Sequence, residues 1–149
     1  MLLPSVASAL VILSMALAPD AVPFKTLERG GAAGVEGPRM LVIRSASQWK
    51  SLSHDLGPNA KPAPVDFTKS TVIGVFLGTR PTGGFSVEIT GIERQGKELV
   101  VTWLEKKPGR DDMVTQVLTS PYHLVTIDKF DGPVKFIRAS DPAADKGHR

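Results

Sequence analysis

The chain has 149 residues, of which 42% are hydrophobic, and this is enough apolar material for one domain with its own core. It contains no cysteine, which excludes disulfides, cysteine nucleophiles and thiolate metal sites. The net charge is +3, and lysine and arginine are scattered among acidic residues instead of forming a basic stripe, which argues against nucleic-acid binding.

The first 18 residues carry no charge, and their apolar centre, residues 9–17, is too short to span a bilayer comfortably. This pattern is typical of a secretory signal, with Ala16-Leu17-Ala18 as a small-residue cleavage site or with cleavage three residues later. A buried first helix and an uncleaved membrane anchor are the alternatives. We take residues 1–21 as a signal segment and expect an exported protein, periplasmic or extracellular, that starts near Val22.

Residues 23–28 and 40–44 are expected to form short strands, separated by a flexible loop that is rich in glycine. The loop lacks the Lys-Ser/Thr ending of a phosphate-binding loop, so nucleotide binding is not expected. A helix follows, because Ser45 and Gln48 form a capping box and Gly57-Pro58 provides a stop. One face of this helix is apolar at helical spacing and should pack on a sheet: Trp49, Leu52 and Leu56.

Two further strands are expected around a loop from Gly78 to Gly84. Residues 72–77 form a continuous apolar run, which fits a strand that is buried on both faces. Residues 85–92 alternate between apolar and polar, as in a half-buried strand. Proline and consecutive glycines in the loop favour a tight reversal, so we expect these two strands to pair as a hairpin with a rigid, exposed loop.

The rest of the chain continues this pattern of short strands. Residues 98–105 are expected to form a strand with both faces at least partly covered, and residues 113–118 are expected to be extended. Shorter strands follow at 124–127 and 134–137, and residues 141–149 form a polar tail. The sum is an α+β domain, a mainly antiparallel sheet or half-open barrel of six to eight short strands with one packed α-helix.

Catalytic chemistry has few candidates in this sequence. A hydrolase would need to combine Ser120, His123 and Asp128, but the Gly-x-Ser-x-Gly motif is missing. The histidines and acids do not have metal-ligand spacing, and Asp111-Asp112 is typical of a solvated turn. We therefore expect no enzyme, no metal site and no cofactor.

Two proline-containing stretches are better candidates for protein binding, because a rigid loop loses little ordering entropy on contact. The alternative is that both stretches are only turns that the fold requires. The candidate partner-binding residues are Arg80, Pro81, Thr82, Gly83, Gly84 and Phe85 in the first stretch, and Ser120, Pro121, Tyr122 and His123 in the second.

These stretches also carry a resemblance to a known family. The run from Gly78 to Val87, the run from Val114 to Val125, Val65-Asp66-Phe67 and the helix with Trp49 resemble the C-terminal domain of the PrcB-type protease-complex-subunit family. The resemblance extends over residues 39–137, and we place a PrcB C-terminal-like domain at 22–140. Phe85 stands where a tyrosine is more usual in the family.

The resemblance implies a non-catalytic exported protein that associates with a secreted protease and stabilises it. Two alternatives stay open. The Arg80–Phe85 loop is loosely similar to the Asn-Pro-Thr-Thr-Gly-Tyr loop of chagasin-like protease inhibitors, and a small-ligand or cell-wall binding domain would need a pocket that a sequence cannot reveal. After cleavage of the signal, no membrane association is expected.

Overall fold

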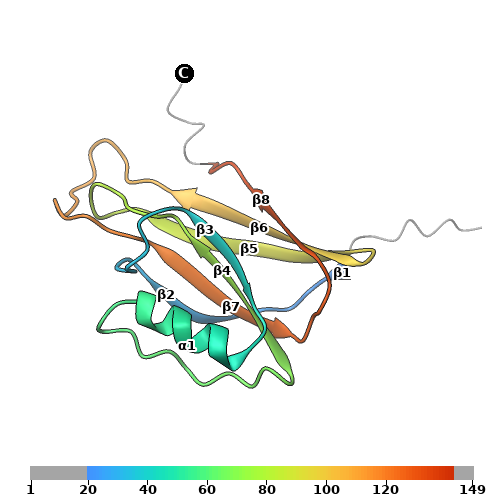
Figure 1. The fold of residues 1–149 in the computed structure, drawn as a ribbon. Helices are drawn as coiled ribbons and strands as arrows, with labels where there is room; N and C mark the ends of the chain where they lie inside the picture. Colours follow the sequence, from blue (N-terminus) through green and yellow to red (C-terminus); the bar gives the residue numbers. More distant parts are fainter. Residues whose placement is uncertain (1–19, 143–149) are drawn as a thin grey trace, which may run out of the picture.

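The computed structural model describes residues 20–142, and these form two four-stranded β-sheets and one helix (Figure 1). Sheet A has the strand order β1-β5-β6-β8, and sheet B has the order β2-β7-β4-β3. All pairs are antiparallel except β6 with β8. The elements are β1 (Asp20–Ala21), β2 (Lys25–Gly30), β3 (Arg39–Ile43), α1 (Ala46–Asp55), β4 (Ser70–Phe76), β5 (Ser86–Gln95), β6 (Glu98–Lys106), β7 (Tyr122–Asp128) and β8 (Val134–Arg138).

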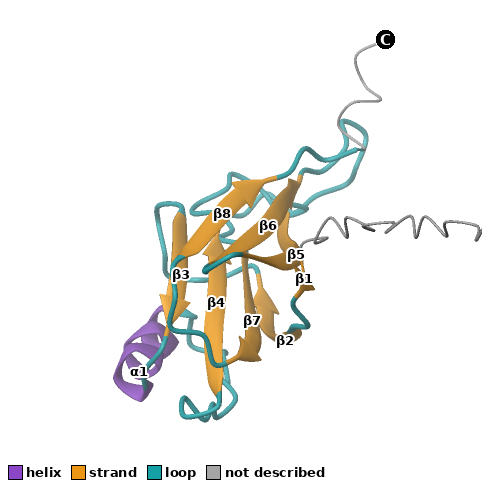
Figure 2. Ribbon diagram, turned by 90° about the vertical axis from the view of Figure 1, so that its right-hand side faces the viewer, coloured by secondary structure: helices purple, strands orange, loops and turns teal. Residues whose placement is uncertain are grey.

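The predicted fold class is confirmed. The described part of the chain is β-rich, with eight short strands, one packed helix and no closed barrel. Figure 2 shows the sheets from the side, with α1 placed beyond β3 and β4, away from sheet A. Sheet B is therefore the middle layer of the domain.

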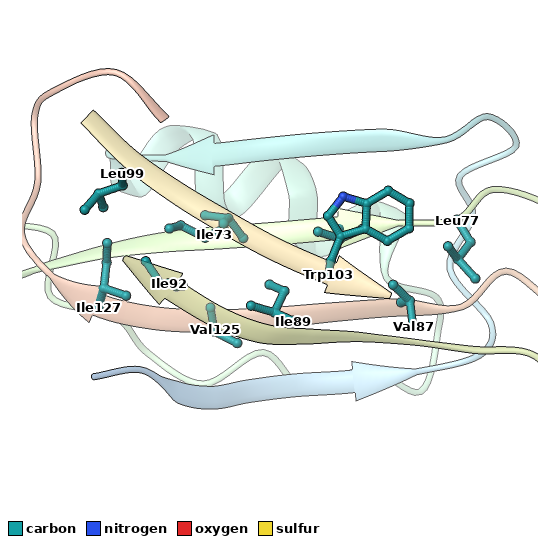
Figure 3. Close-up of a cluster of buried hydrophobic side chains, with 11 residues drawn as sticks. Ile73, Leu77, Val87, Ile89, Ile92, Leu99, Trp103, Val125 and Ile127 are labelled. Atoms are coloured by element: carbon teal, nitrogen blue, oxygen red, sulfur yellow. The ribbon is translucent and has the colours of Figure 1, made fainter. Parts of the chain in front are cut away.

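The main core lies between the two sheets (Figure 3). Ile73 and Val75 of β4 and Val125 of β7 meet Ile89 of β5 and Trp103 of β6, and all five side chains are buried. Since strand residues alternate between faces, the intervening residues of β4 point to the opposite side of sheet B. The continuous apolar run at 72–77 thus belongs to a strand covered on both faces, as predicted.

The second core lies between sheet B and α1, where Val72 and Phe76 of β4 pack with Trp49 and Leu52. The side chain of Ser45 accepts a hydrogen bond from the backbone N–H of Gln48, as the capping box predicts. In a standard capping box the glutamine side chain would accept from the backbone N–H of Ser45. Here the Gln48 side chain accepts instead from the backbone N–H of Arg44, one residue earlier. The helix ends before Gly57, whose φ of +96° suits glycine.

The predicted hairpin of residues 72–77 and 85–92 is wrong. Strands β4 and β5 lie in different sheets, and β4 pairs instead with β3 and β7. The proline and glycines of the intervening loop do reverse the chain, but the reversal carries it from one layer to the other. Turn residues determine a change of direction and not which strands share hydrogen bonds.

The predicted signal segment lies mostly outside the described residues. Its last two residues, Asp20 and Ala21, form β1 and pair with Arg94 and Glu93 of β5. The polar tail beyond residue 142 also lies outside the description. Within residues 20–142, no helix has the length and apolar character required to cross a membrane.

Candidate functional site

Two loops lie side by side at one end of the domain, and we call residues 78–85 and 107–119 the paired loops. The backbone N–H of Arg80 donates to the carbonyl of Thr119 (2.7 Å), and Thr119 returns the bond (2.9 Å). The N–H of Gly83 donates to the carbonyl of Thr115 (2.9 Å), and the Thr119 hydroxyl donates to the carbonyl of Thr82 (2.7 Å). These bonds fix each loop against the other.

Two glycines allow this close approach. A Cβ at Gly83 would collide with the hydroxyl oxygen of Thr115. A Cβ at Gly84 would lie 2.8 Å from Pro108 and 2.9 Å from Val114, and its φ of +85° also favours glycine. The glycine pair is thus needed for the contact between the loops and not only for the turn.

Arg80 has a structural role that the sequence did not indicate. Its Nε donates to Glu105 Oε1 at 2.8 Å, while Arg138 Nη2 donates to Glu105 Oε2 at 2.8 Å. The Glu105 carboxylate is almost completely buried, at the end of the inward-facing row of β6 that also contains Trp103. Burial opposes its ionisation, but Arg80, with help from Arg138, lowers the pKa of the Glu105 carboxyl below its ordinary value. The Arg80 guanidinium is therefore already paired within the protein and only partly exposed.

The rest of the first candidate stretch is at least partly accessible. Pro81 and Gly84 are exposed, and Thr82, Gly83 and Phe85 are half-buried. The structure therefore presents the middle of this loop at the surface, where a partner could reach it.

The paired loops expose large hydrophobic side chains that the sequence did not indicate as part of the site. Met113 is fully exposed, and the exposed fractions of Leu118 and Val117 are 75% and 57%. These three fractions are larger than those of the other exposed large hydrophobic residues, Met40 and Ile137. Residues 113–118 form no strand. Four exposed charges lie beside them, at Lys107, Arg110, Asp111 and Asp112. The available signal was a set of apolar residues, Met113, Val114, Val117 and Leu118, that follows a charged, glycine-containing loop.

The second candidate stretch is buried, so the expectation that it lies in an exposed loop is wrong. Ser120, Pro121, Tyr122 and His123 are all buried in the middle layer. The Ser120 hydroxyl donates to the carbonyl of Val35 at 2.8 Å, which satisfies its donor inside the protein. These side chains are not available to a partner in this structure.

Tyr122 packs on the helix side of sheet B. Its ring stacks on Phe76 with centroids 5.5 Å apart, and its hydroxyl donates to Glu28 Oε1 at 3.1 Å. Burial and the neighbouring Glu28 carboxylate raise the pKa of Tyr122 to about 12. A Cβ at Gly30 would lie 2.8 Å from the ring, so the last residue of β2 must be small.

His123 joins the two sheets. Its Nδ1 accepts a hydrogen bond from the backbone N–H of Ile89 in β5 at 2.9 Å, so the neutral ring carries its proton on Nε2 and donates to the Thr26 hydroxyl at 2.9 Å. A β-bulge at Leu27 brings both Thr26 and Arg29 to this histidine. Burial, followed by the positive charge of Arg29, lowers the pKa of His123 to about 4.

The hydrolase arrangement is not assembled. The Ser120 hydroxyl is bonded to a backbone carbonyl, His123 is bonded to Thr26 and Ile89, and Asp128 lies exposed at the far end of β7. No three histidine or acidic side chains within residues 20–142 are grouped closely enough to hold a metal ion.

Comparison with known proteins identifies one family. Residues 71–128 match the model of the PrcB C-terminal family. No curated protein and no solved structure matches the chain. The matched residues include β4, β5, β6 and β7, both paired loops and all ten candidate residues. This match confirms the resemblance that the motifs indicate for this part of the chain.

Proposed function

We propose that this protein is a non-catalytic binding module that docks onto a partner protein through the paired loops. The observation that carries the proposal is the exposure of Met113, Val117 and Leu118 on loops that are fixed by hydrogen bonds to each other. Burying such side chains against a partner removes apolar surface from water, at about 25 cal/mol for each Å².

The fixed conformation of the loops favours tight binding. Protein association costs free energy wherever a flexible loop must be ordered, and about 0.5–1.5 kcal/mol is lost for each side chain that becomes immobilised. The backbone bonds of Arg80, Gly83 and Thr119 order this end of the domain before a partner arrives. The ion pairs of Glu105 with Arg80 and Arg138 hold the base of the first loop on sheet A.

The partner that the family supports is a secreted protease. Residues 71–128 match the PrcB C-terminal family, the resemblance to which implies association with a protease, and the apolar first segment supports export of the chain. In this proposal the protein is an accessory subunit that keeps the protease folded. The charged residues around the apolar tips (Met113, Val117 and Leu118) include Lys107 and Arg110. They form the polar rim that protein interfaces have around a hydrophobic centre.

The test is affinity capture with the full chain from the exported fraction of its own cells, followed by mass spectrometry. A secreted protease should be enriched, and its half-life in the purified complex should be longer than that of the protease alone. The variant Met113→Ser/Leu118→Ser should lose both the capture and the longer half-life.

A matched control is available in the chain. Met40 and Ile137 are also large, apolar and exposed, each at 42%, but they lie on β3 and β8. The variant Met40→Ser/Ile137→Ser should capture the protease as well as the unchanged chain does. Equal capture by the paired-loop variant and the unchanged chain would contradict docking through these loops, and absence of any protease would contradict the accessory-subunit role.

A further inference from the structure

A pocket lies between the end of β2 and the C-terminal end of α1. It has a volume of about 230 Å³ and is lined by residues 28–32, residues 56–60 and Tyr122. Its walls are formed largely by small or apolar residues, including Gly31, Ala32, Leu56 and Ala60. Apolar walls of this kind suit an alkyl chain.

The charge at this pocket is negative. Glu28 holds the hydroxyl of Tyr122 with one carboxylate oxygen, and its other oxygen, Oε2, is buried without a hydrogen-bond partner. Leu56 and Gly57, at the end of α1, also line the pocket. A helix C-terminus carries a partial negative charge, which favours a cation nearby. A carboxylate with an unused acceptor and a helix C-terminus therefore both favour a positively charged hydrogen-bond donor.

The positive charge closest in sequence does not serve this role. The guanidinium of Arg29 lies on the opposite face of sheet B, 3.3 Å from His123 and 3.9 Å from the Glu88 carboxylate. Neighbouring residues of a strand point to opposite faces, so Arg29 and Glu28 are separated by the sheet. Glu28 forms none of the ion pairs between described residues.

We propose that this pocket binds a primary ammonium group on an unbranched alkyl chain, as in a lysine side chain, through the Glu28 carboxylate and the C-terminal end of α1. The small and apolar walls contact the methylene groups, and the Glu28 carboxylate, which lines the pocket, accepts from the ammonium. Charge-assisted hydrogen bonds of this type are among the stronger ones in proteins. The proposal does not depend on the role of the paired loops.

The test is a titration of the full chain, labelled with ¹⁵N, followed through the backbone amide signals of Gly30, Gly31, Gly57 and Asn59. Three probes are compared: N-acetyl-lysine methylamide, butylamine and N-acetyl-norleucine methylamide. The two amines should shift these signals, while norleucine, which has the alkyl chain without the charge, should not. Tighter binding of the lysine probe than of butylamine identifies a protein lysine as the source, and equal binding identifies a free alkylamine.

Two variants separate binding from folding. Glu28→Gln keeps an acceptor for the Tyr122 hydroxyl but removes the charge, and it should weaken binding about tenfold. Gly31→Leu places its Cβ where no atom lies within 4 Å, and Gly31 is not among the glycines with positive φ, so the added side chain should block the pocket without disturbing the backbone.

Glu93→Gln is the control, because Glu93 is an exposed acid on β5, outside the residues that line the pocket. It should bind the lysine probe as the unchanged chain does. The proposal is overturned if the lysine probe leaves the four signals unmoved, if norleucine moves them equally, or if Glu28→Gln and Gly31→Leu both keep the original affinity.

Discussion

The first candidate stretch forms a backbone bridge, through Arg80, to Thr119, the residue directly before the second stretch, yet the two stretches have different surroundings. The first stretch and its paired loop reach the surface and expose apolar tips, whereas residues 120–123 are buried. The polar side chains of residues 120–123 are buried, whereas Met113, Val117 and Leu118 are exposed, which is the reverse of the usual distribution. A polar residue can thus be buried where the fold supplies hydrogen-bond partners for it.

The buried stretch has these partners. Ser120 bonds Val35, Tyr122 bonds Glu28, and His123 bonds both Thr26 and Ile89. Each of these bonds connects segments that are far apart in the sequence. Burial of a polar group reduces the free energy of unfolding little when its hydrogen bonds are satisfied. When one partner is removed, the other stays buried without a hydrogen bond, and the protein is destabilised by the desolvation of that group. The buried half should therefore respond to mutation through stability, and the exposed half through binding.

The largest effect is expected for His123→Leu. Leucine has a similar volume but cannot accept the hydrogen bond from the backbone N–H of Ile89, which is buried. The free energy of unfolding should fall by about 3 kcal/mol, since a buried donor is left unpaired and the bond to Thr26 is also lost. Urea denaturation followed by tryptophan fluorescence measures this change. A variant as stable as the original protein would show that the two sheets do not depend on this histidine.

Arg80→Ala should have the next largest effect, a loss of about 2 kcal/mol. The variant leaves Glu105 buried with Arg138 alone, and removal of one partner from a buried ion pair is costly. The estimate is lower than for a completely buried pair, because Arg80 is partly exposed and a second arginine stays in place. Arg110→Ala, at an exposed position on the second paired loop, is the control and should change stability by less than about 0.5 kcal/mol. Equal denaturation midpoints for the two variants would return Arg80 to the set of binding residues.

The pKa of His123 predicts an acid-sensitive stability. This pKa is about 4 in the folded protein and about 6.5 in an unfolded chain, so the unfolded state binds more protons between these values. Stability is greatest above pH 6.5 and should fall as the pH decreases towards 4, by at most about 1.4 kcal/mol per pH unit. The His123→Leu variant should show a flatter profile between pH 6.5 and 5. Parallel profiles would mean that other groups cause the loss.

The smallest effect on stability is expected for Met113→Ser/Leu118→Ser. Both side chains are exposed, so the free energy of unfolding should stay within about 0.5 kcal/mol of the original value while capture of the partner is lost. Thermal unfolding by circular dichroism measures the first quantity. A large loss of stability would show that Met113 and Leu118 support the fold. The buried and exposed stretches would then no longer differ in whether mutation affects stability or binding.

The sequence predicted the individual elements well, because their signals are local. The capping residue Ser45, the apolar face with Trp49 and the stop at Gly57 placed the helix within a residue or two of its observed bounds. Alternation placed β5, and apolar residues on both faces placed β6. The continuous apolar run placed β4 in a layer that is covered on both faces.

The pairing of strands could not be read in the same way. The loop with Pro81 and Gly83 has the composition of a hairpin turn, but its glycines serve contacts with Thr115, Pro108 and Val114, which are distant in sequence. Likewise, Ser120 and His123 look like surface residues until Val35 and Ile89 are known to lie beside them. The first candidate stretch therefore lies at the surface and the second is buried, while the exposed Met113 and Leu118 carried no recognisable motif.

The segment that matches the family contains the two central strands of each sheet, β5 and β6 in sheet A and β4 and β7 in sheet B, and this arrangement bears on how the chain folds. Strands β5 and β6 are joined by a tight turn at Gly96, whereas β4 and β7 pair residues as distant as Ser70 and Asp128. The entropy of closing a long loop must be lost before its contacts form. The β5–β6 hairpin should therefore assemble early, and completion of sheet B should limit the folding rate.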